Sequence, residues 1–175
     1  MPVRDADAFF PGGRRAARFL ANRGASGIDG VVSSALGAGA AADLPLFLVV
    51  GDTSFYHDMN GLLAVRRHGL SATIVLVNND GGGIFSLLPQ AEQSEHFEEL
   101  FGMPHGLDFR HAAEMYGLRY NLAASPDDLA RALRGASGAD LIEVRTDRRE
   151  NAHLHRAAWD AVSRALRIPD GVVPR

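Results

Sequence analysis

The sequence predicts an α/β fold in which a doubly wound, mainly parallel sheet carries helices on both faces. Two continuous apolar runs of strand length, Leu44–Val50 and Ala72–Val77, are typical of strands that are buried on both faces. Segments with helical spacing alternate with these runs and with shorter strand-like segments, which is the pattern of an open parallel sheet. The length of 175 residues is enough for one domain.

The opening of the chain, Met1–Arg15, is irregular and contains a Phe-Phe-Pro-Gly-Gly turn cluster. We therefore expect residues 1–17 to be the tail of an upstream linker and residues 18–170 to form the folded domain. The first helical segment is rich in glycine and alanine, which allows close packing on a sheet. In chain order, this half is expected to contain a short strand at Arg18–Asn22, a helix at Ile28–Ala42, the strand Leu44–Val50, a helix at Asp52–His68 and the strand Ala72–Val77.

The second half begins with a glycine-rich loop, Asn78–Pro89, and an excursion with one short helix around Phe97–Phe101. A helix is expected from Asp108 to Tyr116, because aspartate favours a helix start and the following Gly117 favours a helix end. The remaining expected elements are a strand at Leu118–Leu122, a helix at Ser125–Arg134, a strand at Asp140–Arg145 and a helix at Glu150–Arg167.

The composition excludes several kinds of chemistry. There is no cysteine, and all 18 basic residues are arginine, so thiol catalysis, disulfides and Schiff-base lysines are excluded. The net charge of −3 gives no reason to expect a nucleic acid partner. No apolar run approaches the roughly 20 residues of a membrane span, and we expect a cytoplasmic protein. The histidines lack the spacing of a metal site, so the chemistry is expected to depend on carboxylates, amides, arginines, backbone groups or a cofactor.

Polar residues follow the two apolar strands, where parallel sheets of this kind bind ligands. Asp52 comes directly after the first strand, and Asn79 follows the second after an interval of 27 residues, which is one helix plus one strand. Carboxylate and amide oxygens beside a backbone carbonyl of the glycine loop would suit Mg2+, and the amides near Thr53 and Ser54 would suit a phosphate. Taken singly, Asp52 is more typical of a helix cap and the Asn-Asn-Asp-Gly run of a turn.

The same residues resemble the thiamine diphosphate (ThDP) binding motif, with Thr53 where that motif usually has glycine. Longer segments are similar to one family, the 2-succinyl-5-enolpyruvyl-6-hydroxy-3-cyclohexene-1-carboxylate synthases (MenD) of menaquinone biosynthesis. The resemblance extends from about Pro2 to Arg145. It is carried by NRGASGIDG at 22–30, GDTSFYHDMNGLL at 51–63, NNDGGGIFSLLP at 78–89 and FEELFGMPHGLDF at 97–109.

The resemblance covers only the C-terminal, diphosphate-binding domain of a longer enzyme. The pyrimidine-binding domain, with the glutamate that activates the cofactor, and the central domain have no counterpart here, so no catalytic residue is assigned and we expect the isolated chain to be inactive. The family implies Mg2+ bound by Asp52, the Asn79 side chain and the Gly81 carbonyl. The cofactor-binding residues that it implies are Ile28, Gly51, Asp52, Thr53, Ser54, Asn79, Gly81, Gly82 and Ile84.

The family also implies the substrates. MenD enzymes decarboxylate 2-oxoglutarate and add the resulting succinyl carbanion to isochorismate, and arginine forks suit these dicarboxylates. By resemblance, Arg4 and Arg23 bind substrate, while Ile84, Phe85 and Leu88 form an apolar wall near the reacting carbon. The active site of such enzymes lies between domains, which implies a homo-oligomer and the pyrimidine-binding domain of the same or a partner subunit as partners.

Three alternatives stay open at this point. The chain could belong to another ThDP-dependent decarboxylase or ligase such as an acetolactate synthase, although the context of Arg23 argues against this. It could be a non-catalytic, flavodoxin-like module that binds a phosphate or nucleotide without a divalent ion. It could also fold but leave the site too open to hold a cofactor. Binding of ThDP with and without Mg2+ distinguishes these alternatives.

Overall fold

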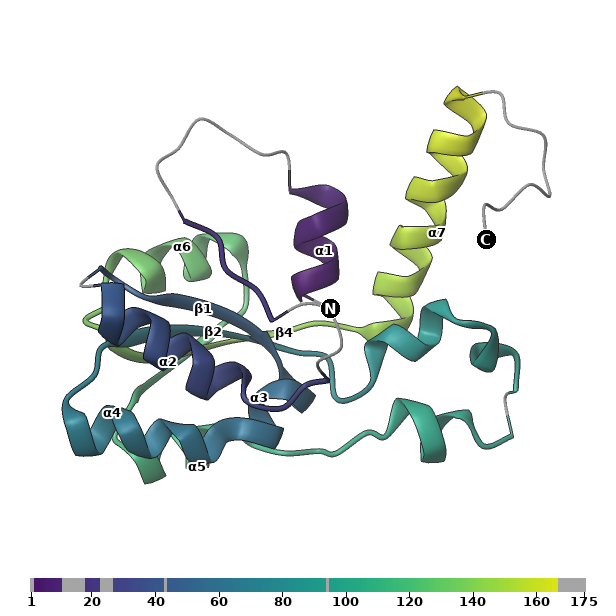
Figure 1. Cartoon of the computed structure of the whole chain (residues 1–175). Helices are drawn as coiled ribbons and strands as arrows, with labels where there is room; N and C mark the ends of the chain where they lie inside the picture. Colours follow the sequence, from purple (N-terminus) through teal and green to yellow (C-terminus); the bar gives the residue numbers. More distant parts are fainter. Residues whose placement is uncertain (1, 11–17, 23–26, 43, 94, 167–175) are drawn as a thin grey trace.

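The computed structural model describes residues 2–10, 18–22, 27–42, 44–93 and 95–166. Its centre is a parallel four-stranded sheet with the strand order β1-β2-β4-β3. Helices cover the sheet on both sides: α2 to α5 lie below it in Figure 1 and α6 lies above it. This arrangement confirms the predicted fold class. The strands are β1 (Phe47–Gly51), β2 (Ala72–Asn78), β3 (Arg119–Ala123) and β4 (Ala139–Arg145).

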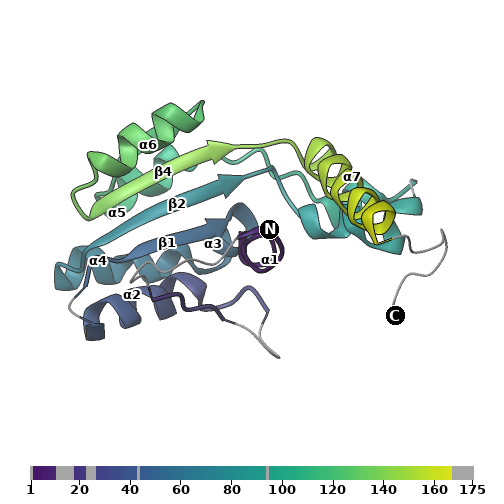
Figure 2. The same cartoon turned by 90° about the horizontal axis from the view of Figure 1, so that it is seen from above.

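The helices alternate with the strands along the chain, and the second view shows α7 extending away from the end of the sheet (Figure 2). The α-helices are α1 (Pro2–Phe9), α2 (Val31–Ala42), α3 (Asp52–Asp58), α4 (Leu63–His68), α5 (Arg110–Tyr116), α6 (Pro126–Arg134) and α7 (Arg148–Ala165). Shorter helical turns are η1 (Met59–Leu62), η2 (Gly83–Leu87), η3 (Pro89–Glu92) and the π-helical η4 (Glu98–Gly102).

The core lies between the sheet and the helices α2 to α5. Ile74 of β2 and Leu141 of β4 stand side by side in the sheet and are fully buried there. Phe55 of α3 packs edge-on against Phe109 at a centroid distance of 5.5 Å. Strand β2 is central and almost entirely buried, as its apolar run predicts. The pairing of Gly51 with Val77 places the carboxyl ends of β1 and β2 next to each other, beside this core.

The expectation that the first apolar strand is buried on both faces is wrong. Among the described residues, strand β1 pairs with β2 alone and forms the edge of the sheet. Its side chains alternate, so Val50 is buried toward the helices, whereas Phe47 and Val49 on the other face are each 55% exposed. An apolar run thus identifies this strand, but it does not say which of its faces is covered.

Residues 18–22 do not form the strand that their sequence suggested. They have no regular secondary structure, and Phe19 and Leu20 are 71% and 72% exposed. A strand requires a partner for its backbone groups, and the sheet described here does not pair with this segment.

Residues 2–9 form a helix, which corrects the expectation of an irregular segment there; Met1 and residues 11–15 of the expected segment lie outside the described residues. Helix α1 begins with a proline, which is favoured in the first turn, and contacts both β1 and α7. Asp5 of α1 lies 3.0 Å from Nε2 of His155 on α7, and the Phe9 ring packs edge-on against the same histidine. These contacts come from residues far apart in the sequence, so the local pattern does not reveal the helix.

The expected helix at Asp52–His68 is three shorter segments: α3, η1 and α4. The interruption is the turn η1, where α2 passes close by: a Cβ on Gly61 would lie 3.3 Å from the backbone nitrogen of Ser33. Asp58 at the end of α3 accepts hydrogen bonds from the backbone nitrogen of Ser33 at 2.7 Å and from its hydroxyl at 3.0 Å. The interruption of the helix therefore allows α2 to pack closely against this segment.

The other helices lie where the sequence predicts them, with shifted ends. Helix α2 begins at Val31 instead of Ile28, because Gly30 has a positive φ of 65° that ends the preceding turn. Ser125 caps α6 by accepting from the Asp128 backbone nitrogen at 3.1 Å, and Asp147 caps α7. Within the described residues, no helix combines the length and the apolar content that crossing a membrane requires.

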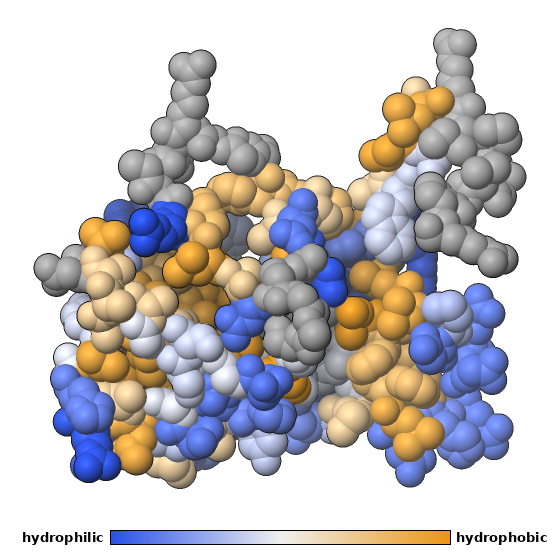
Figure 3. All heavy atoms as spheres, viewed as in Figure 1, coloured by the Kyte–Doolittle hydropathy of each residue, from blue (hydrophilic) through white to orange (hydrophobic). Residues whose placement is uncertain are grey.

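The outer end of α7 is an exposed surface with apolar side chains. Val162 and Leu166 are 56% and 64% exposed there, and orange atoms mark this end at the upper right of Figure 3. Trp159, closer to the sheet, is 48% exposed and packs its ring against His155.

Candidate cofactor and metal site

The site is centred on the Asp52 side chain at the end of β1. Asp52 is 3% exposed and is the first residue of α3. Its Oδ2 accepts hydrogen bonds from the backbone nitrogens of Asn79 at 3.1 Å and Gly81 at 2.9 Å, and its Oδ1 accepts from the Thr53 nitrogen at 2.7 Å. The two strand ends are therefore joined by this carboxylate, which is the juxtaposition that the spacing predicts.

Three oxygen-bearing groups converge at this point. One atom of the Asn79 side-chain amide lies 3.3 Å from Oδ2 of Asp52 and 2.9 Å from the carbonyl oxygen of Gly81. If that atom is the amide nitrogen, it donates to both oxygens; if it is the amide oxygen, three acceptors face one another, as they do around a cation. Carboxylate, amide and carbonyl oxygens are the ligands that Mg2+ prefers, so the donor set fits that metal.

The glycines of the loop allow a second segment to approach it. The Gly82 backbone nitrogen donates to the Gly102 carbonyl at 2.7 Å. A Cβ on Gly81 would collide with the carbonyl oxygen of Gly102, and one on Gly82 would collide with that of Phe101. Gly81 also has a φ of 128°, which side chains rarely tolerate. Glycine is therefore required here for close backbone packing.

Asp80 and His105 connect this second segment to the loop, and sequence reasoning missed both. Asp80 has a positive φ of 59°, and its Oδ1 accepts from the backbone nitrogens of His105 at 3.0 Å and Gly106 at 2.8 Å. The amide of Gly106, and more weakly that of His105, holds the pKa of Asp80 below its ordinary value of 3.8. The His105 Nε2 lies 3.2 Å from Oδ2 of Asp52.

Three further residues expected to contact the cofactor, Gly51, Thr53 and Ser54, lie at the end of β1 and the start of α3. Thr53 is exposed and Ser54 half-buried in the first turn of α3, although the Thr53 amide already donates to Asp52. A Cβ on Gly51 would lie 3.7 Å from Pro2 of α1. Ile28 is 39% exposed in the bend before α2.

The structure describes most of the residues that we expect to contact substrate. Ile84 and Phe85 are half-buried in η2, and the Phe85 ring packs against Phe101 at a centroid distance of 5.5 Å. Leu88, directly after η2, is 37% exposed. Arg4 is exposed on α1, whereas Arg23 lies outside the described residues.

A buried polar network contacts the start of the glycine-rich loop, and the sequence analysis did not predict it. Glu143 of β4 is fully buried, and its carboxylate accepts from Asn78 at 3.0 Å, from the Tyr120 hydroxyl at 2.6 Å and from Arg145 at 2.8 Å. Burial alone would raise the pKa of Glu143, but the donors from Arg145, Tyr120 and Asn78 bring it below its ordinary value. Burial and the Glu143 carboxylate raise the pKa of Tyr120 to about 12.

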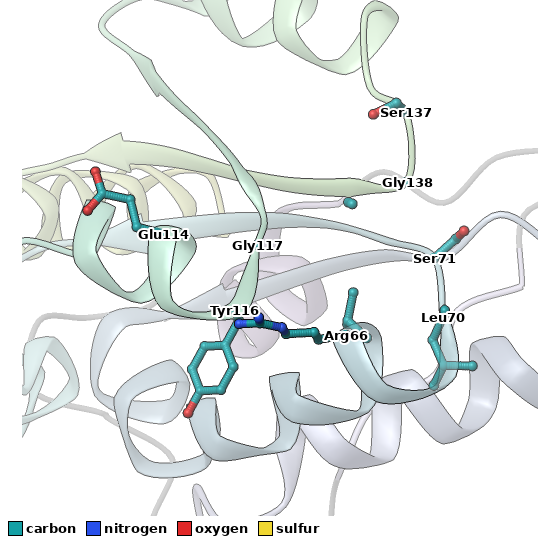
Figure 4. Close-up of a pocket in the computed structure, with 11 residues that line it drawn as sticks. Arg66, Leu70, Ser71, Glu114, Tyr116, Gly117, Ser137 and Gly138 are labelled. Carbon is teal, nitrogen blue, oxygen red and sulfur yellow. The ribbon is translucent and has the colours of Figure 1, made fainter.

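A separate open pocket of about 580 Å³ lies at the opposite end of the sheet (Figure 4). It is lined by Ser71 and Gly138, which come directly before β2 and β4, and by Arg66, Glu114 and Tyr116 of the neighbouring helices. The Arg66 guanidinium donates to the Met115 carbonyl at 3.3 Å. Because parallel sheets of this class bind ligands at their carboxyl ends, the Asp52 site is the stronger candidate.

The sequence is similar to characterised proteins. Residues 8–144 match the family described as "Thiamine pyrophosphate enzyme, C-terminal TPP binding domain". The chain is 56% identical over 169 residues to the 2-succinyl-5-enolpyruvyl-6-hydroxy-3-cyclohexene-1-carboxylate synthase of Geobacillus kaustophilus, covering 95% of this chain and 29% of that enzyme. It is 52% identical over 173 residues to the enzyme of the same name from Listeria innocua, covering 97% of this chain and 30% of that enzyme.

A solved structure agrees with these matches. The thiamine diphosphate-dependent 4-hydroxybenzoylformate decarboxylase of Rhodococcus jostii RHA1 aligns with a TM-score of 0.56 and 30% sequence identity, over 65% of this chain and 22% of that one. The chain spans less than a third of the length of the curated relatives named above. The match over residues 8–144 and the shared fold show that the chain belongs to the family of C-terminal thiamine pyrophosphate-binding domains of thiamine pyrophosphate enzymes.

Proposed function

We propose that this chain is the Mg2+- and diphosphate-binding domain of a MenD-type carboligase. The observation that carries the proposal is the position of the Asn79 amide at neighbouring strand ends, where one of its atoms lies 3.3 Å from the Asp52 carboxylate and 2.9 Å from the Gly81 carbonyl oxygen. These three groups would hold Mg2+, which would bridge to the cofactor's diphosphate. The hydroxyls of Thr53 and Ser54 and the backbone of Gly51 and Gly82 would contact the diphosphate.

The remaining roles follow the orientation of the cofactor. Ile28, in the bend before α2, would support the cofactor from below, and Ile84 would lie beside it. When bound, ThDP supplies the stabilised carbanion needed to decarboxylate a 2-oxo acid. The apolar side chains of Ile84, Phe85 and Leu88 would exclude water next to the reacting carbon.

The activity of the complete protein is part of the same proposal. The complete protein would decarboxylate 2-oxoglutarate, release CO2 and add the resulting succinyl carbanion to isochorismate. Arg4 and Arg23 would pair with substrate carboxylates. The identities of 50% or more to enzymes of this name support MenD over an acetolactate synthase. The proposal includes a homo-oligomer, a pyrimidine-binding domain from the same or a partner subunit, and a cytoplasmic location.

Calorimetric titration of the purified chain with ThDP tests the cofactor proposal. We expect binding in the presence of Mg2+ and none detectable with EDTA, because the metal neutralises the charge between Asp52 and the diphosphate. Asp52→Asn should abolish binding while the far-UV circular dichroism stays unchanged. Asp127→Ala, which alters an exposed carboxylate of α6, is the matched control and should bind normally.

Two results would contradict the proposal. ThDP binding that is equally tight with EDTA would show that no metal mediates the contact. Binding of ADP without Mg2+, unaffected by Asn79→Ala, would support the flavodoxin-like module instead. The chain alone should not release CO2 from 2-oxoglutarate, so measurable decarboxylation would contradict the assignment of catalysis to residues outside it.

A further inference from the structure

A histidine that is not one of the proposed metal ligands contacts the centre of the site. His105 lies in the segment between η4 and α5, 53 residues after Asp52, and its Nε2 is 3.2 Å from Oδ2 of that carboxylate. The side chain of His105 is 19% exposed. Its ring packs edge-on against Phe109, a core residue, at a centroid distance of 5.6 Å. The imidazole is therefore held in one orientation by the core.

The hydrogen bonds assign the proton to Nε2. The Leu107 backbone nitrogen donates to Nδ1 of His105 at 3.0 Å, so Nδ1 is an acceptor. Nδ1 also lies 3.4 Å from Asp80 Oδ1, but the Leu107 amide is closer and its N–H points at the ring nitrogen. In this tautomer, the Nε2–H of His105 donates to the Asp52 carboxylate.

The backbone around His105 is fixed to the same loop that carries the proposed metal ligands. Asp80 accepts from the amides of His105 and Gly106, and Gly82 donates to the carbonyl of Gly102. The ring is thus positioned on Asp52 from two directions, by the core through Phe109 and by the glycine loop through Asp80. Asp52, the glycine loop and the His105 segment form one hydrogen-bonded unit.

We propose that His105 is a positioning residue that orients the Asp52 carboxylate for Mg2+. The inference rests on the proposed function, because it assigns a role toward the metal of that site. Partners that hydrogen-bond to a metal ligand fix its orientation, and their loss typically lowers metal affinity by about 10–100-fold. His105 is not itself a ligand in this proposal.

The test compares His105→Leu with His105→Gln, whose terminal amide can replace the Nε2–H donor. Mg2+ is titrated into the chain with saturating ThDP and followed by calorimetry. We expect affinity to fall at least about tenfold in His105→Leu and to be largely restored in His105→Gln. His111→Leu is the matched control, because the His111 side chain is 77% exposed on α5. The Mg2+ affinity of this variant should be unchanged.

Hydrogen exchange of the metal-free chain provides a second readout. The amides of Asn79 and Gly81, which donate to Asp52, should exchange faster in His105→Leu than in the wild type, and His105→Gln should restore their protection. Equal Mg2+ affinity in wild type and His105→Leu would overturn the inference, as would tighter binding in His105→Leu, which would make His105 a competitor for the carboxylate. If the wild type itself shows no Mg2+-dependent ThDP binding, the proposed function fails first and the inference fails with it.

Discussion

Glu143 and Asn78 share a hydrogen bond in the interior of the sheet. The Glu143 Oε1 accepts from Nδ2 of Asn78 at 3.0 Å, and both side chains are buried. The amide oxygen of Asn78 in turn accepts from the Asp80 backbone nitrogen at 3.0 Å. Strand β4 is thereby connected to the turn that carries Asn79 and Gly81, although neither Glu143 nor Asn78 is assigned to bind a ligand.

Glu143→Ala should lower the free energy of unfolding by about 3 kcal/mol, because it leaves the Asn78 amide and the Tyr120 hydroxyl without their buried acceptor. Urea denaturation followed by circular dichroism measures the change. Glu95→Ala removes an exposed glutamate and should change stability by less than about 0.5 kcal/mol. A similar small loss in both variants would show that the network does not stabilise the fold.

The same network predicts a loss of stability in alkali. Because the pKa of Tyr120 is raised to about 12 in the folded chain from an ordinary value of 10.0, its contribution is complete below pH 10 and is lost as the pH rises to 12. The pKa of Glu143 is lowered, so its contribution is complete above its ordinary value of 4.5 and is lost as the pH falls. Thermal unfolding from pH 9 to 12 tests the first part, and Tyr120→Phe should flatten that loss. An identical alkaline slope in both proteins would contradict it.

Gly81→Ala should be more damaging than alanine at another glycine with positive φ. The new Cβ would collide with the Gly102 carbonyl, and an alanine would be strained at a φ of 128°. We therefore expect the free energy of unfolding to fall by more than about 2 kcal/mol. Gly69→Ala at the end of α4 has a φ of 62° and nothing within 4 Å, and should cost about 1 kcal/mol. Chemical denaturation compares the two. Equal losses would mean that the contact with residues 101–103 is not tight.

Asp58→Ala should destabilise the first turn of α2. The Asp58 carboxylate accepts from both the nitrogen and the hydroxyl of Ser33, as a capping side chain would, and its loss should cost about 1–2 kcal/mol. Ser33→Ala removes only the hydroxyl bond and should cost less. Hydrogen exchange of the first turn of α2 should increase in Asp58→Ala and much less in Ser33→Ala. If the two variants cost the same, the backbone contact contributes nothing.

The sequence was sufficient where the signal is local. The apolar run at Ala72–Val77 predicts a strand buried on both faces, which β2 is, and Ser125 followed by Pro126 is typical of a helix start. Asp52 and Asn79 could be paired in advance, because the topology of a parallel sheet places consecutive strand ends together.

The sequence was insufficient where distant contacts decide the structure. Helix α1 is stabilised by contacts such as Asp5 with His155, 150 residues apart, which no local pattern reveals. The apolar side chains at residues 18–22 suggested a strand, but strand formation depends on a partner edge. His105 and Glu143 reach Asp52 and Asn78 over 53 and 65 residues, so only the folded chain shows that they belong to the site.

Anomalous scattering from a crystal grown with Mn2+ and ThDP tests the metal site most directly, since Mn2+ replaces Mg2+ in an oxygen ligand set. We expect one strong anomalous peak, from a metal ion coordinated by Asp52, the Asn79 amide oxygen and the Gly81 carbonyl, with the diphosphate completing the coordination. A crystal that contains the cofactor but has its metal elsewhere, with the Asn79 amide nitrogen donating to Asp52, would contradict it.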